Sequence, residues 1–129
     1  MKGEVDNVIN IPTSLKGKFF KYWFKFLLPF HGLTDREMYV AAAFLLKRFE
    51  LSKVISDVNI LNSVLMNEDT KREIREIVGI GHQHFQVIMS KLRKAKVIID
   101  NKINPRFIPN VKEENGNFKL LLLFTFDDV

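Results

Sequence analysis

Cysteine is absent from the 129-residue chain, which excludes a disulfide framework, a thiolate metal site and a cysteine nucleophile. Glycine and proline are scarce, with 6 and 4 residues, and no glycine-rich phosphate loop or nucleophile elbow is present. No run reaches the roughly 18 uninterrupted apolar residues that a membrane-spanning helix needs. The mixed, polar start of the chain lacks the arrangement of a signal peptide. These absences predict a soluble protein that does not insert into a membrane.

Metal and acid–base chemistry have few candidate side chains. His82 and His84 are two residues apart on a predicted helix and therefore point apart, and His31 is distant in sequence. With no cysteine and no nearby acid cluster, these histidines do not suggest a metal site. Glu73 and Glu76 have the spacing of a solvated helix surface rather than of an acid–base pair. We expect no metal, no cofactor and no enzymatic activity.

The residues that are present suit one domain with a basic surface. Hydrophobic residues make up 47% of the chain, enough for one core, and the net charge is +5. Residues 14–33 hold four lysines and no acid, and residues 34–96 hold eleven bases and eight acids. Residues 97–129 hold four bases and five acids. A basic front and middle suit a phosphate-bearing partner.

Local patterns predict an extended N-terminal arm over residues 1–13 and a single domain over residues 14–129. Ser14 is a plausible N-cap for an aromatic-rich helix that starts at Leu15 and is stopped by Pro29. The domain is divided into this N-terminal region over 14–32, a helical core over 33–96 and a β wing over 97–126. Four helices are expected in the core. The first runs from the capping box at Thr34–Glu37 to about Arg48, and the others cover Val58–Leu65, Thr70–Val78 and Gly81–Ala95. In the third, Ile74 and Ile77 are expected to point inward.

The last third of the chain changes from helical to strand periodicity. A short strand is predicted over Val97–Asp100, with a two-residue turn at Asn101-Lys102 and a return strand from Ile103 that prolines interrupt. Acids and asparagines at 113–117 form the expected hairpin tip, and 118–126 is the longest strand candidate. The fold class is therefore mainly α with a C-terminal β-hairpin, an α+β arrangement.

Three helices followed by a β-hairpin is the order of a winged helix-turn-helix domain, and residues 33–126 resemble that family. The resemblance is carried by "LTDREMYVAAAFLL" and "TKREIREIVGIGHQHFQVIMSKLRKAKVI". "SKLRKAKVIID", which overlaps the end of the second stretch, resembles the end of a recognition helix that enters the first wing strand: a buried leucine, two bases, a small residue and a β-branched pair. Winged helices bind DNA, and they also serve as protein-interaction modules.

The composition and several segments also resemble small proteins of tailed bacteriophages, including crAss-like phages of Bacteroidota. That resemblance is carried by "FHGLTDRE", by "HFQVIMSKLRKAKVIIDNKINPRFIP" and by the abundance of lysine, isoleucine and asparagine. It implies a phage origin and no catalytic residue. The protein is then expected in the cytoplasm of the host cell or in the virion.

The helix over 82–95 is the candidate DNA-binding element. At roughly 100° per residue, one side of the helix holds Phe85, Ile88, Met89, Leu92 and Ala95, and the side of Gln83 holds Gln86, Val87, Ser90, Arg93 and Lys94. Glutamine can pair with adenine, arginine with guanine, and lysine or serine with phosphate. The candidate DNA-binding residues are His82, Gln83, Gln86, Ser90, Lys91, Arg93, Lys94 and Lys96. Any amphipathic surface helix also turns such residues to water, and the acids Glu113 and Glu114 at the wing tip would be repelled by phosphate.

The aromatic-rich helix and the apolar terminal strand favour a second class of function. The helix has three interpretations. It can lie on a membrane surface, bind nucleic acid through a basic stripe with aromatics, or pack in a core or interface with one solvated lysine face. A strand that is apolar on both faces needs cover on both sides. The candidate partner-interface residues are Phe19, Phe20, Trp23, Phe24, Phe26, Leu121 and Leu123. The alternative to a double-stranded DNA binder is therefore a structural virion protein, in a connector, ring or other assembly, that packs against other phage structural proteins or forms a homo-oligomer.

Overall fold

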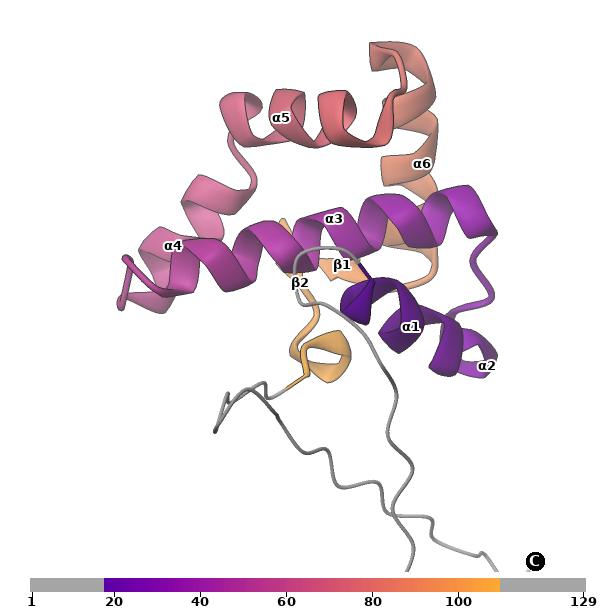
Figure 1. Ribbon diagram of the computed structural model, residues 1–129, viewed down its shortest axis with the longest axis horizontal. Coiled ribbons are helices and arrows are strands. Elements are labelled where there is room, and N and C mark those ends of the chain that lie inside the picture. The colour runs from indigo at the N-terminus through magenta and orange to yellow at the C-terminus, as the bar shows by residue number, and fades with distance from the viewer. Residues whose placement is uncertain (1–17, 110–129) are drawn as a thin grey trace, which may run out of the picture.

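A computed structural model of the chain describes residues 18–109. The elements lie in the order α1 (Phe19–Phe26), α2 (Leu28–His31), α3 (Asp35–Ser52), α4 (Val58–Leu65), α5 (Glu68–Val78), α6 (His82–Lys94), β1 (Ile98–Ile99), β2 (Lys102–Ile103) and a 3-10 turn, η1 (Pro105–Phe107) (Figure 1). The predicted mainly helical class with a small antiparallel hairpin is confirmed for this part of the chain. The predicted arm over 1–13, the Ser14 cap, the acidic tip over 113–117 and the strand over 118–126 lie outside the described residues.

Helix α3 is the central element of the fold. Figure 1 shows α1 and α2 on one side of α3, α5 on the other side, α4 at its C-terminal end and α6 running across its N-terminal half. The predicted capping box starts the helix: the Glu37 backbone N–H donates to Thr34 Oγ1 (3.4 Å), and the Thr34 N–H donates to Glu37 Oε1 (3.0 Å). Buried alanines 41–43 keep the helix narrow there, so neighbouring helices can approach it closely.

The aromatic-rich N-terminal helix is broken where a single helix was predicted to run to Pro29. Helix α1 ends at Phe26, and Pro29 lies in the first turn of the separate helix α2. Proline is favoured at that position because its missing N–H would have no partner inside the helix. Gly32 then ends α2 in the left-handed conformation, with φ of 64°.

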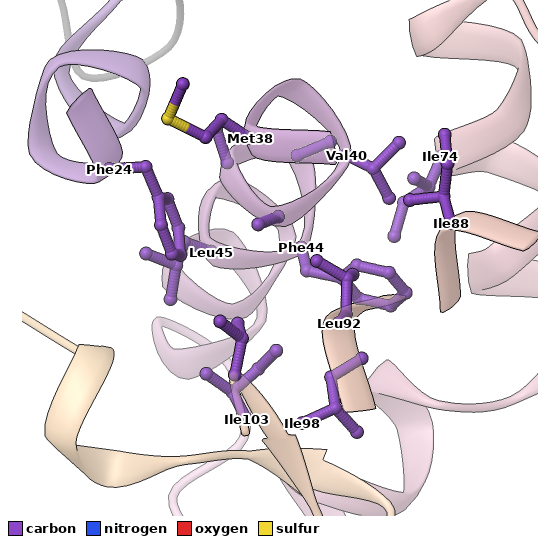
Figure 2. Packing of buried hydrophobic residues seen from close by; sticks show 14 of the residues in the cluster. Phe24, Met38, Val40, Phe44, Leu45, Ile74, Ile88, Leu92, Ile98 and Ile103 are labelled. Carbon is purple, nitrogen blue, oxygen red and sulfur yellow. The ribbon is translucent and has the colours of Figure 1, made fainter. Parts of the chain in front are cut away.

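The core is one hydrophobic cluster that joins α1, α3, α5, α6 and the hairpin. Figure 2 shows Phe44 of α3 beside Leu92 of α6, and Val40 of α3 beside Ile74 and Ile88. The rings of Phe44 and Phe85 lie 6.2 Å apart, which places an aromatic pair between α3 and α6. Ile77, which was predicted to point inward from α5, is instead 50% exposed, because α5 meets α3 through Ile74 and Val78.

The hairpin is shorter than predicted and its turn lies one residue earlier. Ile98 pairs with Ile103 and Ile99 with Lys102, so the turn residues are Asp100 and Asn101 rather than Asn101 and Lys102. Both turn residues have positive φ, 53° and 57°, as the tight turns that match strand twist require. Ile98 and Ile103 are buried against the helices, which fixes this register because a one-residue slip would turn them to solvent.

Candidate nucleic-acid interface

A three-residue turn sets the position of α6 relative to α5. Gly79 adopts φ of 77°, a conformation that glycine reaches without the steric cost of a Cβ. The N–H groups of Gly79 and Ile80 both donate to the Arg75 carbonyl, at 2.8 and 3.1 Å, and Arg36 Nη1 donates to the Val78 carbonyl at 3.5 Å. These bonds satisfy two of the last four carbonyls of α5. Helix α6 therefore begins directly after α5 and runs from the end of α5 across α3, at a steep angle to α5 (Figure 1).

The rotation of α6 about its own axis is determined by its buried side. Phe85, Ile88, Met89 and Leu92 are all buried. Arg75 of α5 adds a cation–π contact, with its guanidinium carbon 5.4 Å from the centre of the Phe85 ring. Because these contacts involve one side of the helix, the opposite side is left to solvent. We call that side the outward face of α6; it comprises the exposed residues of 82–94.

All eight candidate DNA-binding residues are exposed, on α6 or immediately after it. They are His82, Gln83, Gln86, Ser90, Lys91, Arg93, Lys94 and Lys96. At about 100° per residue, Gln83, Ser90 and Lys94 follow one stripe along the helix. Val87, which is 57% exposed, lies in the same stripe. Val87 was not among the candidate site residues, although its helical angle places it among the polar side chains.

The charge of this region is of one sign. Residues 82–99 contain four cations, Lys91, Arg93, Lys94 and Lys96, and no aspartate or glutamate. Among the described residues none of these four makes a salt bridge; the ion pairs there are Lys47–Glu73 and Arg72–Asp69. Unpaired surface cations on one helix produce a positive potential that attracts polyanions.

Lys96 lies at the joint between α6 and the hairpin. It has φ of 61°, its N–H donates to the Arg93 carbonyl at 3.0 Å, and its own carbonyl accepts from Asn104 Nδ2 at 2.9 Å. The backbone N–H of Asn104 also donates to the Val97 carbonyl at 2.8 Å. The hairpin is thereby held against the C-terminal end of α6, beside the four cations.

The predicted partner interface is partly wrong. Phe19, Phe20 and Phe24 are buried inside the protein, because α1 packs them against α3 and the end of the described chain. Trp23 is half-buried, and its Nε1–H donates to the Phe107 carbonyl at 2.7 Å. Phe26 is on the surface, as are three neighbours that were not among the candidates: Tyr22, Leu28 and Phe30. Leu121 and Leu123 lie outside the described residues.

The three histidines occupy two kinds of environment. His31 is structural: the Leu33 N–H donates to its Nδ1 at 3.0 Å, so its Nε2 carries the proton and donates to the Phe24 carbonyl at 2.7 Å. His82 and His84 are exposed in the first turn of α6. Within residues 18–109, no three histidine, aspartate or glutamate side chains come together as a metal site would require. None of the helices in that range has the length and apolar character of a membrane span.

A groove of about 400 Å³ lies away from α6, between α1, α3 and η1. Its lining includes Phe20, Phe49 and Ile108, with Arg48 as its charged member. Burial lowers the pKa of Arg48 from its usual value, because the charged guanidinium loses hydration there. Arginine stays protonated under physiological conditions despite such a shift, so the groove holds a positive charge.

No protein-family model, no curated protein and no solved structure matches this chain. The function proposed below therefore depends on the residues of α6 and on the sequence resemblances alone.

Proposed function

We propose that the chain is a non-enzymatic winged-helix module of a tailed bacteriophage that binds double-stranded DNA through α6. The observation that carries the proposal is the outward face of α6, which is exposed and mostly polar and carries Lys91, Arg93 and Lys94, with Lys96 just after it and no acid from residue 82 to residue 99. A helix of this kind fits the major groove, where its N-terminal residues meet the base edges.

The outward face separates into two parts along the helix. The first two turns hold Gln83 and Gln86, whose amides can donate to and accept from base edges. The last turn and the residues after it hold the cations, which suit phosphate oxygens. The N-cap is Gly81, which has no side chain to satisfy the first N–H groups of α6, and no other residue of the described range 18–109 accepts from them; these N–H groups can therefore donate to a phosphate.

The dependence of DNA affinity on salt tests the proposal. Each neutralised phosphate contributes about 0.9 to the slope of log affinity against log salt concentration, so we expect the double variant Arg93→Ala/Lys94→Ala to lower the slope by about 2. The matched control is Lys25→Ala/Lys53→Ala, which removes the same charge from α1 and from the far end of α3; it should leave the slope within error. Absence of DNA affinity at low salt, or an equal effect of both double variants, would overturn the proposal.

A second candidate is a structural virion protein, and one surface favours it. Four apolar side chains of α1 and α2 are exposed: Tyr22, Phe26, Leu28 and Phe30. Because they lie outside the core, the fold does not depend on their apolar character. Phe26 and Phe30 are 50% and 59% exposed. Clustered apolar side chains on a surface are typical of protein–protein contacts, and these would pack against a second copy or another phage structural protein.

Light scattering distinguishes this candidate from the first. A closed oligomer that dissociates on Phe26→Ser/Phe30→Ser, while Val54→Ser at the far end of α3 has no effect, would support the assembly role. A monomer at all concentrations, together with salt-dependent DNA binding, would leave only the DNA-binding proposal.

A further inference from the structure

Val87 is an apolar side chain in the middle of the outward face of α6. It lies one turn after Gln83, next to Gln86, and one turn before Ser90 and Lys91, all of which are exposed and polar. The apolar anchor of α6 is complete without it, since Phe85, Ile88, Met89 and Leu92 are buried on the other side. A single exposed valine is common on protein surfaces; its place among candidate base-contacting residues distinguishes this one.

Local stability does not account for a valine at this position. β-Branched residues lose side-chain freedom in a helix, so alanine, glutamate or lysine would favour an exposed helical site more than valine does. Val87 contributes little to the core at 57% exposure. Its isopropyl group is therefore available for an apolar contact outside the chain.

In the major groove of DNA, the apolar feature of the base edges is the C5 methyl group of thymine. Adenine, its partner, presents the N7 acceptor and the N6 donor that a glutamine amide pairs with in two hydrogen bonds. Guanine is read most often by arginine or lysine, and the segment from His82 to Ser90 contains neither. The side chains at the start of the outward face thus match an A·T pair in both hydrogen bonding and apolar contact.

We propose that the first half of α6 selects A·T base pairs, with Val87 packing on a thymine methyl group and Gln83 and Gln86 pairing with adenine. The cations from Lys91 onward supply affinity that is independent of sequence. This inference deepens the proposed DNA-binding function and rests on it.

The test begins with selection of bound duplexes from a randomised DNA pool. We expect the selected sequences to be enriched in A·T pairs. A selected duplex is then synthesised with thymine and again with uracil, which removes only the methyl group. The loss of one buried methyl contact corresponds to about a fourfold loss of affinity, so wild-type protein should bind the uracil duplex about fourfold more weakly per contacted thymine.

Val87→Ala should bind the thymine duplex as weakly as wild-type protein binds the uracil duplex, and should not distinguish the two. The matched control is Ile77→Ala, which removes a similarly exposed apolar side chain from α5 and should preserve the preference for thymine. Salt-dependent binding without A·T enrichment, or with equal affinity for both duplexes in wild-type protein, would overturn this inference and leave the proposed function intact. Failure to bind any duplex at low salt would overturn both.

Discussion

Helices α5 and α6 are neighbours of similar length, 11 and 13 residues, yet their surface charges are organised differently. Helix α5 carries four acids and three bases, and two of its acids form ion pairs, Glu73 with Lys47 and Asp69 with Arg72. Helix α6 carries three bases and no acid, and these bases form no salt bridge with the described residues. Within residues 18–109, two acids of α5 are thus neutralised by ion pairs, whereas no acid pairs with the bases of α6.

The two helices also differ in how their N-terminal ends are capped. Asn67 caps α5, accepting a hydrogen bond from the Thr70 N–H at 2.8 Å, and Glu68 and Asp69 in its first turn complement the helix dipole. Helix α6 starts at Gly81 with no side-chain cap and no acid in its first turn. The bases in the last turn of α6 interact favourably with the negative C-terminal end of its helix dipole, so they also stabilise the helix itself. The start of α5 thus has a side-chain acceptor for its N–H groups, whereas the start of α6 has none among the described residues.

The largest expected effect comes from removing the buried anchor of α6. Phe85→Ala deletes a fully buried ring that contacts Phe44 and Arg75, and large-to-small changes of this kind cost about 3–5 kcal/mol of unfolding free energy. Urea unfolding followed by circular dichroism measures the loss. Val87→Ala, on the other side of the same helix, should change stability by less than about 0.5 kcal/mol. Similar losses in both variants would contradict the assignment of a buried and an outward face.

A smaller effect is expected from removing the cap of α5. Asn67→Ala leaves the Thr70 N–H without its acceptor and should lower the free energy of unfolding by about 1 kcal/mol. DNA affinity should be unchanged, because α5 is not the proposed contact. Asn59→Ala is the control, since the Asn59 side chain lies exposed within α4 and makes no capping bond. A parallel loss of DNA affinity in Asn67→Ala would show that α5 takes part in binding.

The smallest change in stability, with the sharpest functional contrast, is expected at Gly81. Its backbone angles, φ −79° and ψ 171°, suit any residue, and an added Cβ meets no atom within 4 Å. Gly81→Asp and Gly81→Asn should both stabilise the protein by a few tenths of a kcal/mol as N-caps. Only the aspartate places a negative charge where a phosphate is proposed to bind. We therefore expect DNA affinity to fall in Gly81→Asp and to persist in Gly81→Asn; equal affinities would contradict contact at this end.

Much of the helical part could be predicted because its signals are local. The capping box at Thr34 and Glu37, the α4 segment, and the glycine at the end of α5 act through residues within four positions of one another. The eight candidate DNA-binding residues were correctly placed on an exposed surface for the same reason, since the apolar period of α6 determines which side is buried. Their binding to DNA stays a prediction.

The parts that could not be predicted depend on contacts between distant segments. Six aromatic residues in and around α1 have no periodicity that separates core from surface, and the packing of α1 on α3 decides that Phe24 is buried while Phe26 is half exposed. The hairpin register is decided by the burial of Ile98 and Ile103 against the helices, which moved the turn by one residue. The helical angle placed Val87 on the polar side of α6, but Val87 was not among the candidate site residues; its 57% exposure comes from the structure.

By itself, the sequence determined that the chain forms amphipathic helices and a short hairpin, and that residues 82–99 carry positive charge only. The physical reason is that caps, turns and helical periods involve neighbours along the chain. Only the tertiary structure decided which apolar side chains fold inward, which of them remain exposed, and that the outward face of α6 stays uncovered by the other described elements. Those outcomes depend on which faces meet, and the faces that meet belong to segments far apart in sequence.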